Sequence, residues 1–225
     1  MTDGPDAATV LKALERDYVV AVLRAPDAER ARTAIAALIT GGVTAVEVAY
    51  TTPEATDVID WVRTEHPEIV VGAGTVRTQQ QVQDAAAAGA AFLVSPGLDA
   101  AVAGAMIDSG RMCAVGALSP TEVMAVAAYS GIPVVKLFPG SLGGPAYLRA
   151  LRGPFPELRF MPTGGVAPES IRSWMEAGAA AVGAGGELCP SSAIATGDSA
   201  EIQRRARLFL TAVRSARDSR TTSHS

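Results

Sequence analysis

Short apolar runs alternate with amphipathic stretches along almost the whole chain. The runs are rich in valine, alanine and leucine, and most of them end at glycine or proline. Runs of this length and composition predict buried β-strands. The eight predicted strands are residues 18–23, 46–49, 69–71, 92–94, 112–115, 134–138, 158–161 and 180–183.

The stretches between these runs predict helices, because apolar residues recur there at helical spacing and capping residues precede them. A first helix is predicted over residues 7–16, before the first strand, and a last one carries Ile202, Ala206, Phe209 and Val213 on one face. Residues 218–225 are predicted to form a disordered tail. The predicted helix starts are Asp27, Thr52 with Pro53 at the first helical position, Thr78, Asp99 and Ser119.

Continuous apolar strands alternating with helices indicate a parallel sheet that is covered by helices. Eight such units predict a (β/α)8 TIM barrel, here as a single domain over residues 1–217 with an added N-terminal helix. A doubly wound open sheet is the alternative fold. It is disfavoured because no GxGxxG motif follows the first predicted strand.

The composition excludes several classes of protein. The 225 residues are 48% hydrophobic with a net charge of −4, and no basic block predicts nucleic-acid binding. No apolar run is long enough to cross a membrane, and the acidic N-terminus argues against a signal peptide, so we expect a cytoplasmic protein. Cys113 and Cys189 are predicted to be reduced core residues, and His66 and His224 alone predict no metal site.

Lys136 is the most unusual residue of the pattern, because it lies inside an apolar strand. The chain has only two lysines, Lys12 and Lys136, among its 19 lysines and arginines. A lysine kept at such a position suggests a need for an amine, which forms Schiff bases where a guanidinium does not. The alternative is a structural lysine that reaches the barrel rim or pairs with an acid.

Glu47 is a second charge within a predicted strand, between Val46 and Val48. Strand alternation allows both Glu47 and Lys136 to point into the barrel while their neighbours pack outward against helices. The alternative role for Glu47 is a structural partner of an arginine such as Arg24.

Glycine clusters follow the seventh and eighth predicted strands, at Gly164-Gly165 and at residues 183–186. The loops after these strands form a frequent phosphate site of such barrels, since glycine lets the backbone N–H groups approach an anion. A lysine nucleophile, a buried carboxylate and a phosphate cradle together suit covalent catalysis on a phosphorylated carbonyl compound.

Six motifs of the chain also occur in one order in a known family. The motifs are Glu47-Val48, Thr52-Pro53, Gly72-Ala73-Gly74-Thr75-Val76, Val94-Ser95-Pro96-Gly97, Val135-Lys136-Leu137-Phe138-Pro139 and Pro162-Thr163-Gly164-Gly165-Val166. With them, residues 8–215 resemble the class I 2-keto-3-deoxy-6-phosphogluconate (KDPG) aldolases, which include the 4-hydroxy-2-oxoglutarate (KHG) aldolases.

The resemblance implies a homotrimeric, cofactor-free lyase of carbohydrate metabolism, of the Entner–Doudoroff type. It would cleave a 2-keto-3-deoxy sugar acid to pyruvate and an aldehyde. Lys136 would be the Schiff-base lysine and Glu47 the general acid and base. The implied substrate contacts are Arg24, Thr75, Pro96, Phe138 and Thr163, with Gly164, Gly165, Gly185 and Gly186 at the phosphate.

Two positions depart from the family pattern. Thr51 stands where many members carry a substrate-binding arginine, and Gly186, followed by Glu187, stands where many carry serine. The first change removes a bidentate anion clamp, and the second adds a carboxylate that would repel a phosphate if it faced inward. An aldolase for a non-phosphorylated 2-keto acid, a non-catalytic sugar-acid-binding descendant, and an isomerase or metal-dependent lyase on the same barrel are the alternatives.

Overall fold

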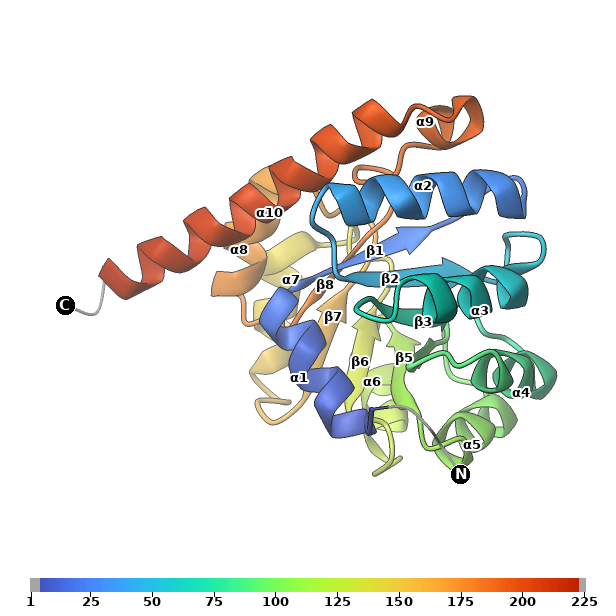
Figure 1. Ribbon diagram of the computed structural model, residues 1–225. Helices are drawn as coiled ribbons and strands as arrows, with labels where there is room; N and C mark the ends of the chain where they lie inside the picture. The colour runs from blue at the N-terminus through green and yellow to red at the C-terminus, as the bar shows by residue number, and fades with distance from the viewer. Residues whose placement is uncertain (1–4, 223–225) are drawn as a thin grey trace.

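The protein is a barrel of eight strands separated by helices (Figure 1). The computed structural model describes residues 5–222. All eight predicted strands are present, with boundaries that move by a few residues. The strands are β1 Val19–Leu23, β2 Ala45–Ala49, β3 Val70–Gly74, β4 Phe92–Val94, β5 Met112–Ala117, β6 Val134–Leu137, β7 Arg159–Pro162 and β8 Val182–Ala184.

Every strand pairs in parallel with its neighbours in the sequence, in the order β7-β6-β5-β4-β3-β2-β1-β8. A bridge between Thr163 and Gly183 joins β7 to β8 and completes the ring. The predicted (β/α)8 barrel is therefore confirmed, and the doubly wound open sheet is wrong.

Helices surround this barrel, and α1 covers its amino-terminal end (Figure 1). Val10 and Leu14 of α1 pack in one buried cluster with Val20, Phe92 and Met112 from inside the barrel. The helices are α1 Ala7–Asp17, α2 Ala28–Thr40, α3 Ala55–Glu65, α4 Gln79–Ala87, α5 Ala100–Asp108, α6 Pro120–Ala127, α7 Gly144–Arg152, α8 Ile171–Glu176, α9 Ser191–Thr196 and α10 Ser199–Thr222, with a 3-10 turn at Pro168–Ser170.

Four of the five predicted helix starts are confirmed by side-chain caps. Asp27, Thr78, Asp99 and Ser119 each accept a hydrogen bond from a backbone N–H of the following first turn. Such a cap satisfies one of the N–H groups that a helix start leaves without an intrahelical partner.

The predicted start at Thr52 is wrong. Helix α3 begins at Ala55, after Glu54 in a left-handed conformation and without a side-chain cap. The Thr52 hydroxyl instead accepts a hydrogen bond from the backbone N–H of Ala25, at 3.1 Å. Thr52 therefore links the loop after β2 to the loop after β1, at the carboxyl end of the barrel.

The prediction of a disordered tail from residue 218 is wrong for residues 218–222, which extend α10; residues 223–225 lie outside the described part. The long helix packs against α2 and α8 (Figure 1). The four residues predicted for its buried face, Ile202, Ala206, Phe209 and Val213, are buried, and Ala216 continues that face. The buried face thus extends to Ala216, and the helix continues to Thr222.

Two smaller expectations concern the core and the membrane. Cys113 and Cys189 are buried and unpaired, as predicted, and burial raises the pKa of each thiol to about 12. Within residues 5–222, we find no helix that is both long and apolar enough to span a bilayer.

Candidate active site

The structure brings Lys136 and Glu47 together inside the barrel. Lys136 lies on β6 and Glu47 on β2, and their side chains point inward from these two strands. The exposed fractions are 2% and 0%, and the Lys136 Nζ lies 3.6 Å from the Glu47 Oε1. Two opposite charges in a shared interior partly offset the desolvation of each other.

The Glu47 carboxylate keeps unused hydrogen-bonding capacity. Neither of its oxygens accepts a hydrogen bond from any other residue in the described part of the chain. Arg24, the partner considered from the sequence, donates its Nη1–H to the Thr51 hydroxyl at 2.8 Å instead. Because buried carboxylates are nearly always hydrogen-bonded, unpaired Glu47 oxygens are typical of a group that acts on a ligand.

Three strand glycines make space for Glu47, Thr163 and the Pro96 backbone, and sequence reasoning missed their role. A Cβ at Gly74 would lie 2.0 Å from the Glu47 Oε1, and one at Gly183 would lie 2.4 Å from the Thr163 Oγ1. A Cβ at Gly116, which pairs with Lys136, would lie 2.1 Å from the Pro96 carbonyl oxygen. Glycine within a strand is the signal that could have identified them.

Two threonines stand at the carboxyl ends of β3 and β7. Thr163 follows β7, is 6% exposed, and donates only a long 3.5 Å hydrogen bond to the Met161 carbonyl. Thr75 follows β3 with a φ of 57°, a left-handed conformation that is costly for a β-branched residue. Strain of this kind concentrates at functional sites, and both hydroxyls lie where barrel enzymes bind substrate.

Phe138 forms one side of the site entrance. Its ring centroid lies 5.3 Å from the Lys136 Nζ, within the range of a cation–π interaction. Phe138 and Pro96 also line a cavity of about 250 Å³ between the loops that follow β4, β5 and β6.

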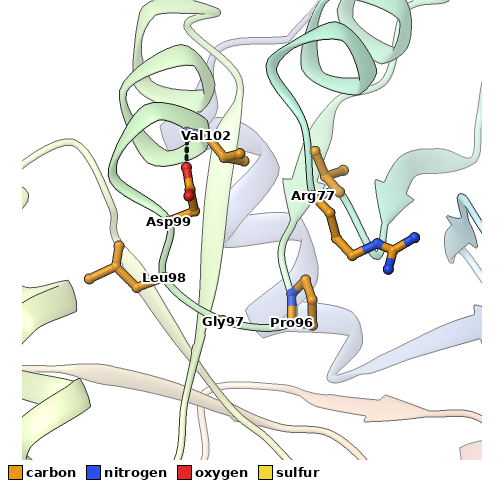
Figure 2. A pocket seen from close by; sticks show the side chains of 7 residues that line it. Arg77, Pro96, Gly97, Leu98, Asp99 and Val102 are labelled. Carbon is orange, nitrogen blue, oxygen red and sulfur yellow. Dashed lines mark hydrogen bonds between the residues drawn. The ribbon is translucent and has the colours of Figure 1, made fainter.

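A neighbouring cavity of about 180 Å³ shares Pro96 and Gly97 with the first (Figure 2). Figure 2 shows these two residues at its base, with the Arg77 side chain on one side and Asp99 on the other. Asp99 also lines this cavity, and its carboxylate accepts a hydrogen bond from the Val102 N–H at 2.9 Å, which caps α5. Arg77 is a rim cation that sequence reasoning did not single out.

The glycines after β7 and β8 present free backbone donors. Gly164 and Gly165 have φ values of 93° and 70°, the left-handed region that glycine adopts without strain. In the part of the protein that the structure describes, Gly165, Gly185 and Gly186 donate no backbone hydrogen bond outside the strand ladders. Successive free N–H groups of this kind form anion-binding concavities.

A metal-binding site is not part of this arrangement. Over residues 5–222, no group of three or more histidine, cysteine, aspartate or glutamate side chains is placed to hold a metal ion. What the structure brings together is one amine, one carboxylate that accepts no hydrogen bond, two hydroxyls, an aromatic wall and two loops with free N–H groups.

Comparison with known proteins adds a family relationship. A family profile described as KDPG and KHG aldolase matches residues 10–205. A 2-dehydro-3-deoxy-phosphogluconate aldolase of Treponema pallidum is 37% identical, over 86% of this chain and 92% of the relative. A KHG/KDPG aldolase of Escherichia coli is 36% identical, over 84% of this chain and 89% of the relative.

A solved structure gives the same relationship. The KDPG aldolase from Legionella pneumophila, with pyruvate captured as a covalent carbinolamine intermediate, superimposes with a TM-score of 0.81 at 30% identity. The match covers 89% of this chain and 97% of that one.

Proposed function

The chain belongs to the KDPG and KHG aldolase family, and from this premise we propose that it cleaves KDPG or 4-hydroxy-2-oxoglutarate to pyruvate and an aldehyde. The observation that carries the proposal is the buried Lys136–Glu47 pair, in which the carboxylate has no hydrogen-bond donor of its own. An amine and a free carboxylate 3.6 Å apart are what a Schiff-base lyase needs at its reacting carbon atoms.

The first step of the proposed reaction belongs to Lys136. Its neutral amine attacks the C2 ketone of the substrate and forms a carbinolamine, which loses water to give an iminium ion. The iminium then accepts the electron pair of the C3–C4 bond as that bond breaks. Because an arginine or a protonated lysine has no lone pair for the attack, this role requires an amine at residue 136.

The proton transfers belong to Glu47. Its carboxylate takes the proton of the C4 hydroxyl as the C3–C4 bond breaks, which releases the aldehyde and leaves an enamine. The same carboxyl group then returns a proton to C3, and hydrolysis of the resulting iminium frees pyruvate and the lysine. One group serves as base and then as acid, so no second titratable residue is required.

The remaining site residues fit the parts of a substrate that do not react. The free N–H groups of Gly165, Gly185 and Gly186, with Gly164 beside them, suit the 6-phosphate of KDPG. Arg24 on the rim, with the Thr75 and Thr163 hydroxyls, suits the carboxylate and hydroxyl groups of the sugar acid. Phe138 and Pro96 form apolar walls around the pyruvate half.

The assembly and the cellular setting are part of the same proposal. We propose a cytoplasmic homotrimer that acts in sugar-acid breakdown of the Entner–Doudoroff type. Met124 and Leu142 are exposed by 63% and 57%, and such large apolar side chains suit contacts between copies. Light scattering on the purified protein measures the mass directly, and a monomer at micromolar concentration would contradict the trimer.

Trapping of the imine tests the chemistry. We would incubate the protein with pyruvate, reduce it with borohydride and locate the added mass by peptide mapping. Reduction converts an iminium into a stable secondary amine, so we expect the adduct on Lys136. Lys12 is the internal control, because it is the other lysine of the chain. The absence of an adduct, or one on Lys12 alone, would overturn the proposal in favour of a protein that only binds a sugar acid.

Substrate comparison tests the specificity. Turnover of KDPG well above that of 4-hydroxy-2-oxoglutarate is expected if the glycine loops bind phosphate. Equal or lower turnover of KDPG would favour a non-phosphorylated 2-keto acid, as Thr51 in place of an arginine suggests.

A further inference from the structure

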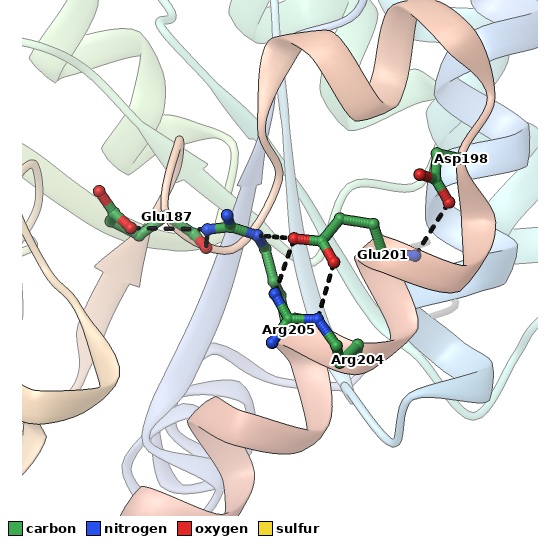
Figure 3. A network of polar contacts seen from close by, with 5 residues as sticks. All are labelled: Glu187, Asp198, Glu201, Arg204 and Arg205. Atoms are coloured by element: carbon green, nitrogen blue, oxygen red, sulfur yellow. Dashed lines mark hydrogen bonds and ion pairs between the residues drawn. The ribbon is translucent and has the colours of Figure 1, made fainter.

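We propose that Arg205 is a positioning residue for the loop after β8: it turns the Glu187 carboxylate away from the anion site and fixes the loop that carries Gly185 and Gly186 (Figure 3). The inference rests on the proposed function, because it assigns Arg205 a part in binding the phosphate of the substrate.

The loop after β8 is a tight turn around one carbonyl group. The backbone N–H groups of Leu188 and Cys189 both donate to the Gly185 carbonyl, at 2.9 and 2.7 Å. This closure leaves the N–H groups of Gly185 and Gly186 without a partner in the described structure. The turn therefore presents two donors beside a residue, Glu187, that carries a negative charge.

Arg205 binds Glu187 at two points (Figure 3). Its Nη1–H donates to the Glu187 backbone carbonyl at 2.7 Å, and the same nitrogen lies 3.5 Å from the Glu187 Oε2. The first contact fixes the backbone of the turn, and the second gives the carboxylate a cation to face. A carboxylate next to a cation contributes less repulsion toward an incoming phosphate dianion.

Glu201 in turn holds Arg205 in place. The Arg205 Nε–H donates to the Glu201 Oε1 at 2.6 Å, one helical turn along α10. Arg204 donates to both oxygens of the same carboxylate, at 2.7 and 2.8 Å. Hydrogen bonds from Arg204 and Arg205 lower the pKa of Glu201 to about 2, so the network stays ionised at neutral pH.

The network thus joins the loop after β8 to the helix that packs outside the barrel. The Glu187 side chain is 59% exposed, and among the described residues Arg205 is the cation that it contacts. Without Arg205, the Glu187 carboxylate is free to turn toward the Gly185 and Gly186 N–H groups, where it would compete with a phosphate group. The chemistry at Lys136 and Glu47 would be unchanged.

The test measures KM and kcat of the Arg205→Ala variant for two substrates that undergo the same reaction. KDPG carries the phosphate, and 4-hydroxy-2-oxoglutarate does not. We expect KM for KDPG to rise about fivefold, the upper range for an exposed ion pair. We expect kcat for KDPG and both constants for 4-hydroxy-2-oxoglutarate to stay within about twofold of the wild type, because the variant leaves the reacting groups in place. Inhibition by inorganic phosphate should weaken in parallel with the KDPG effect.

Two further variants separate the repulsion from a general structural effect. Arg204→Ala is the matched control, since Arg204 binds Glu201 but does not contact Glu187, and we expect its KM for KDPG to be unchanged. Glu187→Gln in the Arg205→Ala background should restore most of the lost affinity, because the interfering charge is then gone.

The outcomes divide as follows. An equal rise of KM for both substrates, or a double variant as weak as Arg205→Ala, would overturn the role of Arg205. Wild-type protein that forms the Lys136 adduct but neither prefers KDPG nor is inhibited by phosphate would overturn both the phosphate proposal and this one. If Arg205→Ala does not fold, Arg205→Lys should show a smaller effect in the same direction, selective for KDPG, and a non-selective effect would overturn the inference.

Discussion

The two halves of the barrel interior are built in opposite ways. At the amino-terminal half, Val10 and Leu14 of α1 close the barrel over Phe92, Met112 and Val134, all of them fully or almost fully buried. At the carboxyl half, strand glycines replace such side chains and leave room for one amine and one carboxylate. The same eight strands thus hold a tightly packed core at one end and the buried Lys136–Glu47 pair at the other.

From this difference we expect substitutions in the two halves to affect two different properties of the protein. Substitutions in the packed half should lower the free energy of unfolding and leave the chemistry intact. Substitutions at Lys136 and Glu47 in the carboxyl half should lower activity and change the free energy of unfolding less, because we propose that these residues react with substrate. The following experiments test this division.

Lys136→Arg should have the largest effect. It keeps the charge but loses the amine, so we expect KDPG cleavage to fall by a factor on the order of 10⁴ or more. Pyruvate release in a coupled assay measures it, and circular dichroism checks that the variant is folded. Lys12→Arg is the matched control and should turn over normally. Substantial turnover by Lys136→Arg would contradict the Schiff-base scheme.

Glu47→Gln should come next. Loss of the acid and base is expected to slow turnover by about 10² to 10⁴, the usual contribution of such a group. Borohydride should still trap pyruvate on Lys136, since formation of the iminium relies on the amine. Unchanged turnover would make Glu47 a structural partner of Lys136 and no more.

Phe92→Ala tests the packed half. Removing a fully buried ring should cost about 3–5 kcal/mol of the free energy of unfolding, measured by urea denaturation. The variant that remains folded should cleave substrate at close to the wild-type rate. A selective loss of activity in the folded variant would contradict the division between the two halves.

Glu201→Gln should have the smallest effect on the free energy of unfolding, because Glu201 lies on α10, outside the barrel interior. The folded protein holds the pKa of Glu201 at about 2, below its ordinary value of 4.5, because Arg204 and Arg205 stabilise the charged form. This stabilisation is complete above pH 4.5 and disappears as the pH falls toward 2. The difference in urea midpoint between the wild type and Glu201→Gln should therefore shrink over this range. A difference in urea midpoint that stays constant from pH 4.5 to 2 would contradict the lowered pKa of Glu201.

The sequence predicts the strands of the barrel and two residues of the candidate site, because each of these features has a local sequence pattern. Eight apolar runs identify the barrel, and Lys136 and Glu47 stand out as charges within two of these runs. Strand periodicity then places both inside, which the structure bears out with their 3.6 Å contact. The local sequence pattern is enough to predict whether a strand is buried and which way its side chains point.

Features that depend on remote partners escape such a prediction. Thr52 precedes a proline as a helix cap often does, yet its hydroxyl accepts a hydrogen bond from the Ala25 N–H of a neighbouring loop. Glu187 contacts Arg205, which lies on a different element, α10. The space beside Gly74 is filled by the side chain of Glu47 from the adjacent strand. In each case the decisive contact forms only when the barrel closes.

The order of strand pairing also has a consequence for how the chain folds. Six of the seven paired ladders join strands that follow one another, such as Ala21 with Val46, whereas β1 and β8 bring Val19 next to Val182. Loop-closure entropy makes that last pairing more costly by roughly 1–2 kcal/mol when it forms from an open chain. We therefore expect neighbouring units to assemble early and the β1–β8 seam to close late. The same seam should be the first to exchange its amide hydrogens when the native barrel opens.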